Sequence, residues 1–400
     1  MRFSHCVANI LMCGFVAARS MLHNGILFSE SDITRAKYGI DNEITPYYST
    51  YQQLLNSEGL KSSYAPRPAK VIVRGPITGF TQNYPQLYVD AAVAYQVACL
   101  WTVTGDELYG NLAVKILTSW ANTLENVTGN VERFLASGIY GYQLAVTAEM
   151  MRNYEGFTSD NQTLVKDMLL DIFYPLSYEF LTEHNGHGPN DTHYWSNWDL
   201  CNIACGLAVG VYADRPDIYE YALEYLHNGG GMGTLNKTFP VILTPEESNN
   251  TFGLAEGQES GRDQGHAGLE FAFLAIICQI AYLQGDDLWS YNDNVILKGA
   301  EYFARYNLGY NVPFKPYYSD GVLLSTIGSD SRGDYRPIWS LYYATYVNDR
   351  GFNATYIKEM FESNDVEEGG GWYGPNSGGY DQLGFGSLAY WTYGNSSTNK

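Results

Sequence analysis

The fold class follows from residues 87–120, which read LYVDAAVAYQVACLWTVTGDELYGNLAVKILTSW. The first half is an alanine-rich apolar run, which Gly105 stops before Asp106 begins a second helix. In the second half, apolar residues recur at i, i+4 and i+8, the spacing of one helical face: Leu112, Ile116 and Trp120. The stretch therefore predicts two helices joined by a short capped turn.

The same pattern recurs along the chain. Ala272–Gln284 is an apolar run that ends at Gly285, and Ile203–Ala213 is followed by Asp214, Pro216 and a helix through Tyr225. Further helices are expected near Ser31–Tyr38 and at Phe134–Arg152, Thr158–Glu183, Val295–Tyr306 and Arg336–Val347. Together these segments make roughly ten to fourteen helices and almost no alternating strands. Because neighbouring hairpins bury each other's apolar faces, we expect one toroidal or solenoidal all-α domain.

The two ends of the domain differ from this pattern. Residues 22–85 are irregular apart from the helix near Ser31–Tyr38, and they contain Pro66, Pro68 and Pro76. The chain after Val366 is rich in glycine, at Gly369, Gly370, Gly371, Gly374, Gly378 and Gly379, beside Trp372 and Tyr373. We expect these residues to form loops that fold back over the domain, with short strands.

Composition excludes several classes of protein. The chain has 400 residues, with 23 basic and 43 acidic side chains and a net charge of −20, which excludes a sequence-independent nucleic-acid binder. Apolar residues make up 45% and charged residues 16%, so the chain can bury a large core. The 35 tyrosines suit a long wet groove in which aromatic rings stack on sugars.

Residues 1–20 predict a secretory signal peptide, which leaves a single domain at 21–400. Arg2 and His5 precede the apolar run Val7–Ala18, whose length of about 12 residues is too short to span a bilayer. No later segment is expected to cross a membrane. Seven Asn-X-Ser/Thr sequons follow, at Asn126, Asn161, Asn190, Asn236, Asn249, Asn353 and Asn395. We therefore expect a glycosylated protein that is secreted from the cell.

The cysteines favour no metal centre. Cys6 and Cys13 lie in the signal, which leaves Cys99, Cys201, Cys205 and Cys278. Cys201 and Cys205 lie one helical turn apart, and buried free thiols are favoured over a disulfide or a metal site. Since the chain contains no CxxC pair, a structural zinc is not expected, nor is any other metal or cofactor.

Two polar loops precede apolar helices. The first is HNGHGPNDTHYWSNWD, residues 184–199, and the second is EGQESGRDQGH, residues 256–266. In a toroid the inner helices start on one face, so the loops would meet there, and the helix N-termini would favour an anionic ligand. Simpler roles remain open: Asp263 as a helix cap, Glu259 and Arg262 as a local ion pair, His193 and His266 as structural residues, and Asn190 and Asp191 as a turn. Taken together the two loops favour a site, because burying so many polar groups without a ligand is unfavourable.

A third group contains tyrosines and arginines. Tyr302 and Tyr306 lie one turn apart with Arg305 between them, and Tyr317, Tyr318, Arg332, Tyr335 and Arg336 follow. A tyrosine hydroxyl serves as a base only where cations lower its pKa. Core packing is the alternative for Tyr302. Arg332 and Arg336 either hold substrate carboxylates or pair with Asp330 and Asp334.

The sequence resembles the alginate-lyase domain group of polysaccharide lyases, within the chondroitin AC/alginate lyase superfamily, and most of all polysaccharide lyase family 38. The resemblance runs from about residue 22 to about 340 and is carried by residues 82–84, 86–88, 133–143 and 194–202, by the specific decapeptide 257–266, and by Glu301-Tyr302 and Tyr306-Asn307-Leu308-Gly309. It implies an (α/α) toroid of six or seven helical hairpins that cleaves β-1,4-linked uronans. The loop before Tyr194 varies in the family, so His193 is the least secure transfer, and Thr234–Thr251 looks like a local insertion.

A uronan lyase removes the proton on C5 and expels the oxygen on C4, so it must neutralise the carboxylate beside C5. We assign that task to Asn197 and Arg262, with Glu259 orienting Arg262. His266 is a candidate base or neutraliser, with His193 beside it, and Tyr302 or Tyr306 is the candidate base and acid, Tyr306 being preferred. Candidate substrate-binding residues are Trp195 and Trp198 as stacking platforms, with Gln258, Tyr317, Arg332 and Arg336.

The expected partner is therefore an anionic uronic-acid polysaccharide, glucuronan or mannuronate-rich alginate, and the protein is expected to be a monomer. Two other classes remain open. An (α/α) glycoside hydrolase would use paired carboxylates, which Asp199, Glu256, Glu259 and Asp263 supply. A non-catalytic carbohydrate-binding protein would keep the aromatic residues and tolerate the loss of His266 and Tyr306. The fold cannot decide between these classes.

Overall fold

A computed structural model of the chain describes residues 19–23, 26–57, 64–190, 192–364, 366–369, 371 and 379–392. Four long helices form an inner layer: α3 (Pro85–Thr104), α5 (Arg133–Met150), α8 (Ser196–Tyr212) and α12 (Gln264–Leu283). The outer helices are α4 (Glu107–Ala121), α6 (Ser159–Met168), α7 (Tyr174–Glu183), α9 (Pro216–Asn228) and α13 (Tyr291–Asn307). The all-α expectation is confirmed.

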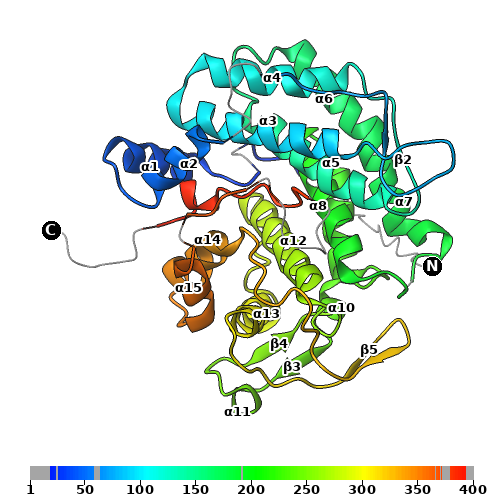
Figure 1. Ribbon diagram of the computed structural model, residues 1–400, viewed down its shortest axis with the longest axis vertical. Coiled ribbons are helices and arrows are strands. Elements are labelled where there is room, and N and C mark those ends of the chain that lie inside the picture. Colours follow the sequence, from blue (N-terminus) through cyan, green and yellow to red (C-terminus); the bar gives the residue numbers. More distant parts are fainter. Residues whose placement is uncertain are drawn as a thin grey trace, which may run out of the picture.

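The inner helices pack side by side in the order α3, α5, α8 and α12, and the outer helices cover them (Figure 1). Nearly every residue of α8 is buried, as expected for an inner helix, whereas α9 buries only one face. Helices pair as α1 (Glu30–Asp41) with α2 (Tyr47–Leu55), α3 with α4, α5 with α7, α8 with α9, α12 with α13, and α14 (Trp339–Tyr342) with α15 (Thr355–Glu362). The described chain thus forms six pairs in an (α/α) toroid.

The predicted turn between α3 and α4 is present. Gly105 ends α3 with φ 72°, a left-handed conformation that glycine adopts without strain. The Asp106 carboxylate then accepts a hydrogen bond from the backbone N–H of Leu108 at 2.9 Å and caps α4. Local chemistry therefore determines where this hairpin reverses.

Helices α5 and α8 approach each other closely through small residues. A Cβ atom on Gly138 would lie 2.6 Å from the Sγ atom of Cys201, so no larger residue fits there. All four described cysteines, Cys99, Cys201, Cys205 and Cys278, are free and buried, and burial raises the pKa of each thiol. The prediction of buried free thiols is confirmed.

Several element boundaries differ from expectation. The helix expected over Thr158–Glu183 is broken by a π-helical turn at Leu169–Phe173, and Tyr343–Asp349 is also π-helical. The helix expected at Val295–Tyr306 is assigned from Tyr291 to Asn307, but Asn292, Asp293 and Asn294 in its first turn have positive φ angles and are not helical. Helices α2 and α15 were not predicted. In each place the backbone follows its tertiary contacts, which a single-sequence pattern does not contain.

Three pairs of short strands lie at the edges of the helical layers. Strands β1 (Val71–Val73) and β2 (Asn126–Thr128) are parallel. Strands β3 (Val241–Leu243) and β4 (Leu254–Glu256) are antiparallel, as are β5 (Tyr317–Ser319) and β6 (Val322–Leu324). The expected insertion at 234–251 contains β3 and two short helices, α10 (Leu235–Thr238) and α11 (Pro245–Ser248). Strand β4 leads directly into the second polar loop, which fixes the start of that loop.

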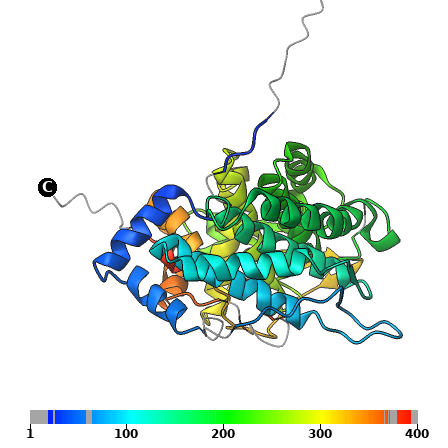
Figure 2. The same cartoon turned by 90° about the horizontal axis from the view of Figure 1, so that it is seen from above.

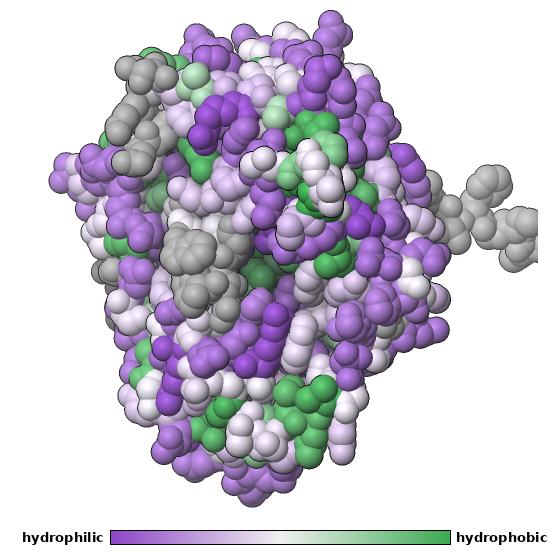
Figure 3. Space-filling view, turned by 45° about the vertical axis from the view of Figure 1, so that its right-hand side comes forward, coloured by the Kyte–Doolittle hydropathy of each residue, from purple (hydrophilic) through white to green (hydrophobic). Residues whose placement is uncertain are grey.

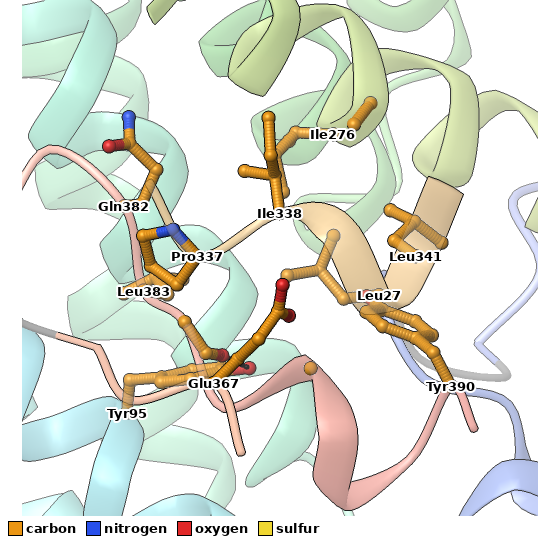
Figure 4. A pocket seen from close by; sticks show the side chains of 13 residues that line it. Leu27, Tyr95, Ile276, Pro337, Ile338, Leu341, Glu367, Gln382, Leu383 and Tyr390 are labelled. Carbon is orange, nitrogen blue, oxygen red and sulfur yellow. Dashed lines mark hydrogen bonds between the residues drawn. The ribbon is translucent and has the colours of Figure 1, made fainter. Parts of the chain in front are cut away.

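The C-terminal loops fold back over the domain, as expected. The Gln143 Nε2 atom donates to the backbone oxygen of Tyr380 at 2.8 Å, so this segment reaches the inner helix α5. Gln382, Leu383 and Tyr390 line a small cavity together with Tyr95 and Ile338 (Figure 4). Of the glycine-rich stretch, Gly370, Trp372, Tyr373, Gly374 and Gly378 lie outside the described residues.

Helices α3 and α12 are each long and apolar enough to cross a membrane, contrary to the expectation that no later segment has this character. In the structure they are inner helices of the toroid, with 67% and 78% of their most apolar windows buried by protein. Their apolar side chains therefore pack in the core of the protein. In the view from above, helices α1 and α2 (blue) lie at one side of the molecule, and the green helices α8 and α9 lie toward the other (Figure 2).

Candidate functional site

The two polar loops meet at the N-terminal ends of α8 and α12. The backbone N–H of Ser196 donates to Gln258 Oε1 at 2.9 Å, and the backbone N–H of Asn197 donates to Glu259 Oε1 at 2.9 Å. Asp263 caps α12, since its Oδ1 atom accepts the backbone N–H of His266 at 2.8 Å. The convergence predicted from the toroid is present, and Asp263 does have the capping role that the sequence left open.

Arg262 is the cation at the centre of this site. Its NH1 atom donates to Glu259 Oε2 at 3.0 Å, and its Nε atom lies 3.5 Å from Asp263 Oδ2. The guanidinium also stacks over the Trp195 ring at 4.8 Å. The Glu259 side chain is fully buried, whereas 25% of the Arg262 side chain is exposed. A buried carboxylate thus fixes a guanidinium that still reaches solvent.

Glu259 holds a second potential donor beside Arg262. The Asn197 Nδ2 atom donates to Glu259 Oε1 at 2.6 Å, and Asn197 itself is buried. An amide nitrogen carries two hydrogens, so a second N–H remains on Asn197. One carboxylate therefore orients both residues that the sequence analysis assigned to charge neutralisation.

His266 lies one helical turn after Arg262. Its Nδ1 atom is 2.7 Å from Asp263 Oδ2, and its Nε2 atom is 3.2 Å from the NH2 atom of Arg262. A guanidinium only donates, so the tautomer that suits this geometry carries its proton on Nδ1 and a lone pair on Nε2. Burial would raise the pKa of Asp263, but hydrogen bonds from His266 and the Arg262 charge lower it overall. Asp263 therefore orients His266 as an acceptor.

The two candidate tyrosines occupy different environments. Tyr302 is almost fully buried against Leu243 and Leu254, burial raises its pKa, and its hydroxyl has no hydrogen-bond partner among the described residues. It therefore lies in the core, the alternative that the sequence left open. Tyr306 is also buried, with 7% of its surface exposed, but it lies at the end of α13, with the Arg332 guanidinium 3.9 Å above its ring.

The position of Tyr306 is fixed by its neighbour in the chain. Asn307 Nδ2 donates to Gln264 Oε1 at 2.9 Å, which joins the end of α13 to the start of α12. Arg332 Nε donates to the Tyr306 backbone oxygen at 2.8 Å. Of the two tyrosines, the structure therefore leaves Tyr306 as the candidate for proton transfer.

Three predicted substrate-binding residues are instead internal tethers. Gln258 is fully buried and joins Ser196 to Ser319, and the Tyr317 hydroxyl donates to the Gln258 backbone oxygen at 2.8 Å. Arg336 is buried and its Nε donates to the backbone oxygen of Gly265 at 3.1 Å. Because their polar atoms are engaged inside the protein, these side chains shape the loop from behind.

The remaining predicted residues lie at the edges of the loops. Trp195 is half-buried beneath Arg262, whereas Trp198 packs against Phe180 and Tyr194. His193 is exposed, with its Nδ1 atom 3.3 Å from Asp320 Oδ2, and Arg332 is exposed. The face shown in Figure 3 is hollowed near its centre. Within the described ranges no group of three or more acidic, histidine or cysteine side chains is placed to bind a metal ion.

Sequence reasoning missed Ser196 and Glu270. The Ser196 Oγ atom lies 2.8 Å from Glu270 Oε1 and 3.2 Å from Glu259 Oε1, and all three side chains are buried. The available signal was Glu270 itself, the only acidic residue in the 20 residues of α12. A lone acid in so apolar a helix requires polar partners.

The family model described as alginate lyase matches residues 46–238. No curated protein matches the chain. An alginate lyase from Bacteroides ovatus has 12% sequence identity and a TM-score of 0.60, over 93% of this chain and 100% of that chain. An alginate lyase from Sphingomonas species A1 has 14% identity and a TM-score of 0.58, over 92% of this chain and 96% of that one. A variant of the latter, with tyrosine replaced by phenylalanine, is complexed with a tetrasaccharide and has a TM-score of 0.59 at 14% identity, over 93% of this chain and 96% of that chain.

Proposed function

We propose that this chain is a polysaccharide lyase that cleaves glucuronan or polymannuronate by β-elimination, because the alginate lyase family model matches residues 46–238 and the fold is similar to that of solved alginate lyases. The observation that carries the proposal is Arg262, a partly exposed guanidinium held by a buried carboxylate next to the lone pair of His266. The site thus offers positive charge and a proton acceptor within one helical turn.

Arg262 and Asn197 would neutralise the uronate carboxylate. The C5 proton beside a charged carboxylate is hardly acidic, and its removal builds negative charge on the carboxylate oxygens. Donors that are already oriented stabilise this charge without reorganising. Glu259 supplies that orientation because it holds both donors from a fully buried position. The net charge of −20 does not oppose binding, since steering depends on the local field of the cleft.

The elimination moves one proton off carbon and one onto oxygen. A base takes the C5 proton, the C5–H electron pair forms the C4=C5 double bond, and the bond between C4 and its glycosidic oxygen breaks. That oxygen then takes a proton and becomes the hydroxyl of the released chain. In glucuronate and mannuronate the C5 proton and O4 are syn, so one group on that side can serve both steps. Tyr306 is proposed for this role, with His266 Nε2 as the alternative acceptor.

A hydrolase mechanism has less support from this site. Glu259 and Glu256 are fully buried, and Asp199 is engaged by His184, Tyr225 and the backbone N–H of Gly233. Burial raises the pKa of Glu256 to about 7, but its Oε1 atom is held by the backbone N–H of Lys315. Paired carboxylates must flank the scissile bond, and these side chains lie inside the protein.

Ultraviolet absorbance of the C4=C5 double bond tests the proposal. The protein is incubated separately with glucuronan, polymannuronate and polyguluronate, and we expect absorbance to rise on one of the first two. A rise only on polyguluronate would exclude the single-group syn mechanism. New reducing ends without a rise would show hydrolysis, and binding without either signal would show a non-catalytic protein.

Secretion and glycosylation are a further part of the proposal. Residues 1–18 of the predicted signal 1–20 lie outside the described residues, as does Asn395. Of the other sequons, Asn126, Asn190, Asn236, Asn249 and Asn353 are exposed and Asn161 is half-buried. We expect the protein in the medium of a eukaryotic host, with a lower apparent mass after removal of N-linked glycans. Retention in the cell without a mass change would contradict this expectation.

A further inference from the structure

Ser196 lies between two buried carboxylates. Its Oγ atom is 2.8 Å from Glu270 Oε1 and 3.2 Å from Glu259 Oε1. Ser196, Glu259 and Glu270 are all buried, so bulk solvent does not supply a missing hydrogen bond to any of them. These three side chains come from the start of α8, the second polar loop and the interior of α12. They form the floor beneath Arg262 and Asn197.

The Ser196 hydroxyl cannot form hydrogen bonds with both carboxyl groups if both are ionised. A serine hydroxyl has one hydrogen, and an ionised carboxylate only accepts. The hydroxyl can therefore donate to one carboxylate, while its lone pairs would face the other at hydrogen-bond distance. The contact becomes favourable when the second carboxyl group carries a proton and donates it to the serine oxygen. One of the two acids is thus protonated.

The surroundings decide which acid holds the proton. Glu259 receives the Arg262 guanidinium at 3.0 Å and the Asn197 amide at 2.6 Å, which suits an anion. Apart from Ser196, Glu270 receives the backbone N–H groups of Gln258 at 3.0 Å and Glu259 at 3.3 Å, and no described cation bonds to it. The titratable groups that face Glu270 are Glu259, Tyr317 and Tyr342. Burial, together with the Glu259 charge, raises the pKa of Glu270 well above its ordinary value.

We propose that Glu270 is a neutral positioning residue, which donates to Ser196 so that Ser196 donates to the Glu259 anion. The chain of hydrogen bonds then ends on the carboxylate that orients Asn197 and Arg262. The net charge beneath the site stays at one negative unit, which the Arg262 guanidinium balances. The catalytic consequence of this chain rests on the proposed lyase function, whereas the protonation of Glu270 does not.

The pH dependence of unfolding tests the proton directly. A raised folded pKa means that Glu270 contributes stability below its unfolded pKa and loses that contribution as pH rises through the folded value. Glutamine does not titrate. We therefore expect the Tm of Glu270→Gln, relative to the wild type, to rise by a few degrees between about pH 5 and about pH 8. A difference that is constant with pH would show that Glu270 is an ordinary anion and would overturn the proposal.

Glu270→Ala provides a second variant that also lacks a titratable proton. The readout is the change with pH, so a lower overall stability does not affect it, and a constant difference here would equally overturn the proposal. These measurements need no substrate, so they remain decisive even if no uronan is cleaved.

The lyase activity of two variants distinguishes a positioning role of Glu270 from a role in packing alone. Glutamine keeps the shape and a donor toward Ser196, so we expect Glu270→Gln to retain lyase activity within about tenfold of the wild type. Glu259→Gln removes the anion that holds Arg262, and we expect a loss of about 100-fold or more, mainly in kcat. Equal losses in the two variants would contradict a neutral Glu270.

Discussion

Replacing Arg262 by alanine is expected to lower kcat/KM on the cleaved uronan by about 100- to 1,000-fold, the usual effect of removing one oriented donor from a developing oxyanion. The guanidinium is the partly exposed cation of the site, and Glu259, Asp263 and Trp195 hold it in one orientation. The initial rate of double-bond absorbance measures the effect. Because the charge develops in the transition state, most of the loss should appear in kcat.

Two further variants define what Arg262 contributes. Lysine keeps the charge but not the fork that bonds Glu259 and stacks on Trp195, so Arg262→Lys should recover only part of the activity. Arg215 is an exposed arginine that pairs with Asp217 on the surface, and Arg215→Ala should behave as the wild type. An Arg262→Ala protein that folds normally and retains full activity would remove Arg262 from the mechanism.

The helical hairpins could be predicted because their signals are local. Gly105 and Asp106 specify a stop and a cap by their own backbone and side-chain chemistry, and both act as expected. The π-helical turn at Leu169–Phe173 could not be predicted, because such turns are rare and the residues that form it are equally compatible with a regular α-helix. Helix α2 was not predicted for a related reason, since it is short and depends on contacts with α3 and the C-terminal loops.

The site was predictable where polar residues interrupt an apolar pattern. The loops at 184–199 and 256–266 stood out for this reason, and the structure brings them together. How deeply each polar side chain is buried, however, could not be predicted. Gln258, Tyr317 and Arg336 have the same side-chain chemistry as ligand-binding residues, and only their burial shows that they hold the loop from behind. Glu270 was hidden because it lies within an apolar helix.

The second large effect concerns the two tyrosines of α13, whose hydroxyl groups have different surroundings. Tyr306→Phe is expected to lower kcat by about 100- to 10,000-fold, the range for loss of a proton-transferring group. Tyr302→Phe should change kcat little, since the Tyr302 hydroxyl is buried and has no partner in the described structure. Removing an unsatisfied buried hydroxyl should also leave the free energy of unfolding unchanged or slightly higher. The two substitutions each delete one oxygen from the same helix, so each controls for the other.

The same absorbance assay on the preferred uronan, with urea unfolding of each variant, decides between the residues. If Tyr302→Phe loses activity and Tyr306→Phe does not, then Tyr302 transfers the proton. The core around Tyr302 must in that case open during turnover. If neither variant loses activity, the proton must pass to His266, whose Nε2 lone pair faces Arg262 at 3.2 Å. In that event His266→Gln, rather than Tyr306→Phe, should abolish the elimination, because glutamine cannot accept a proton at neutral pH.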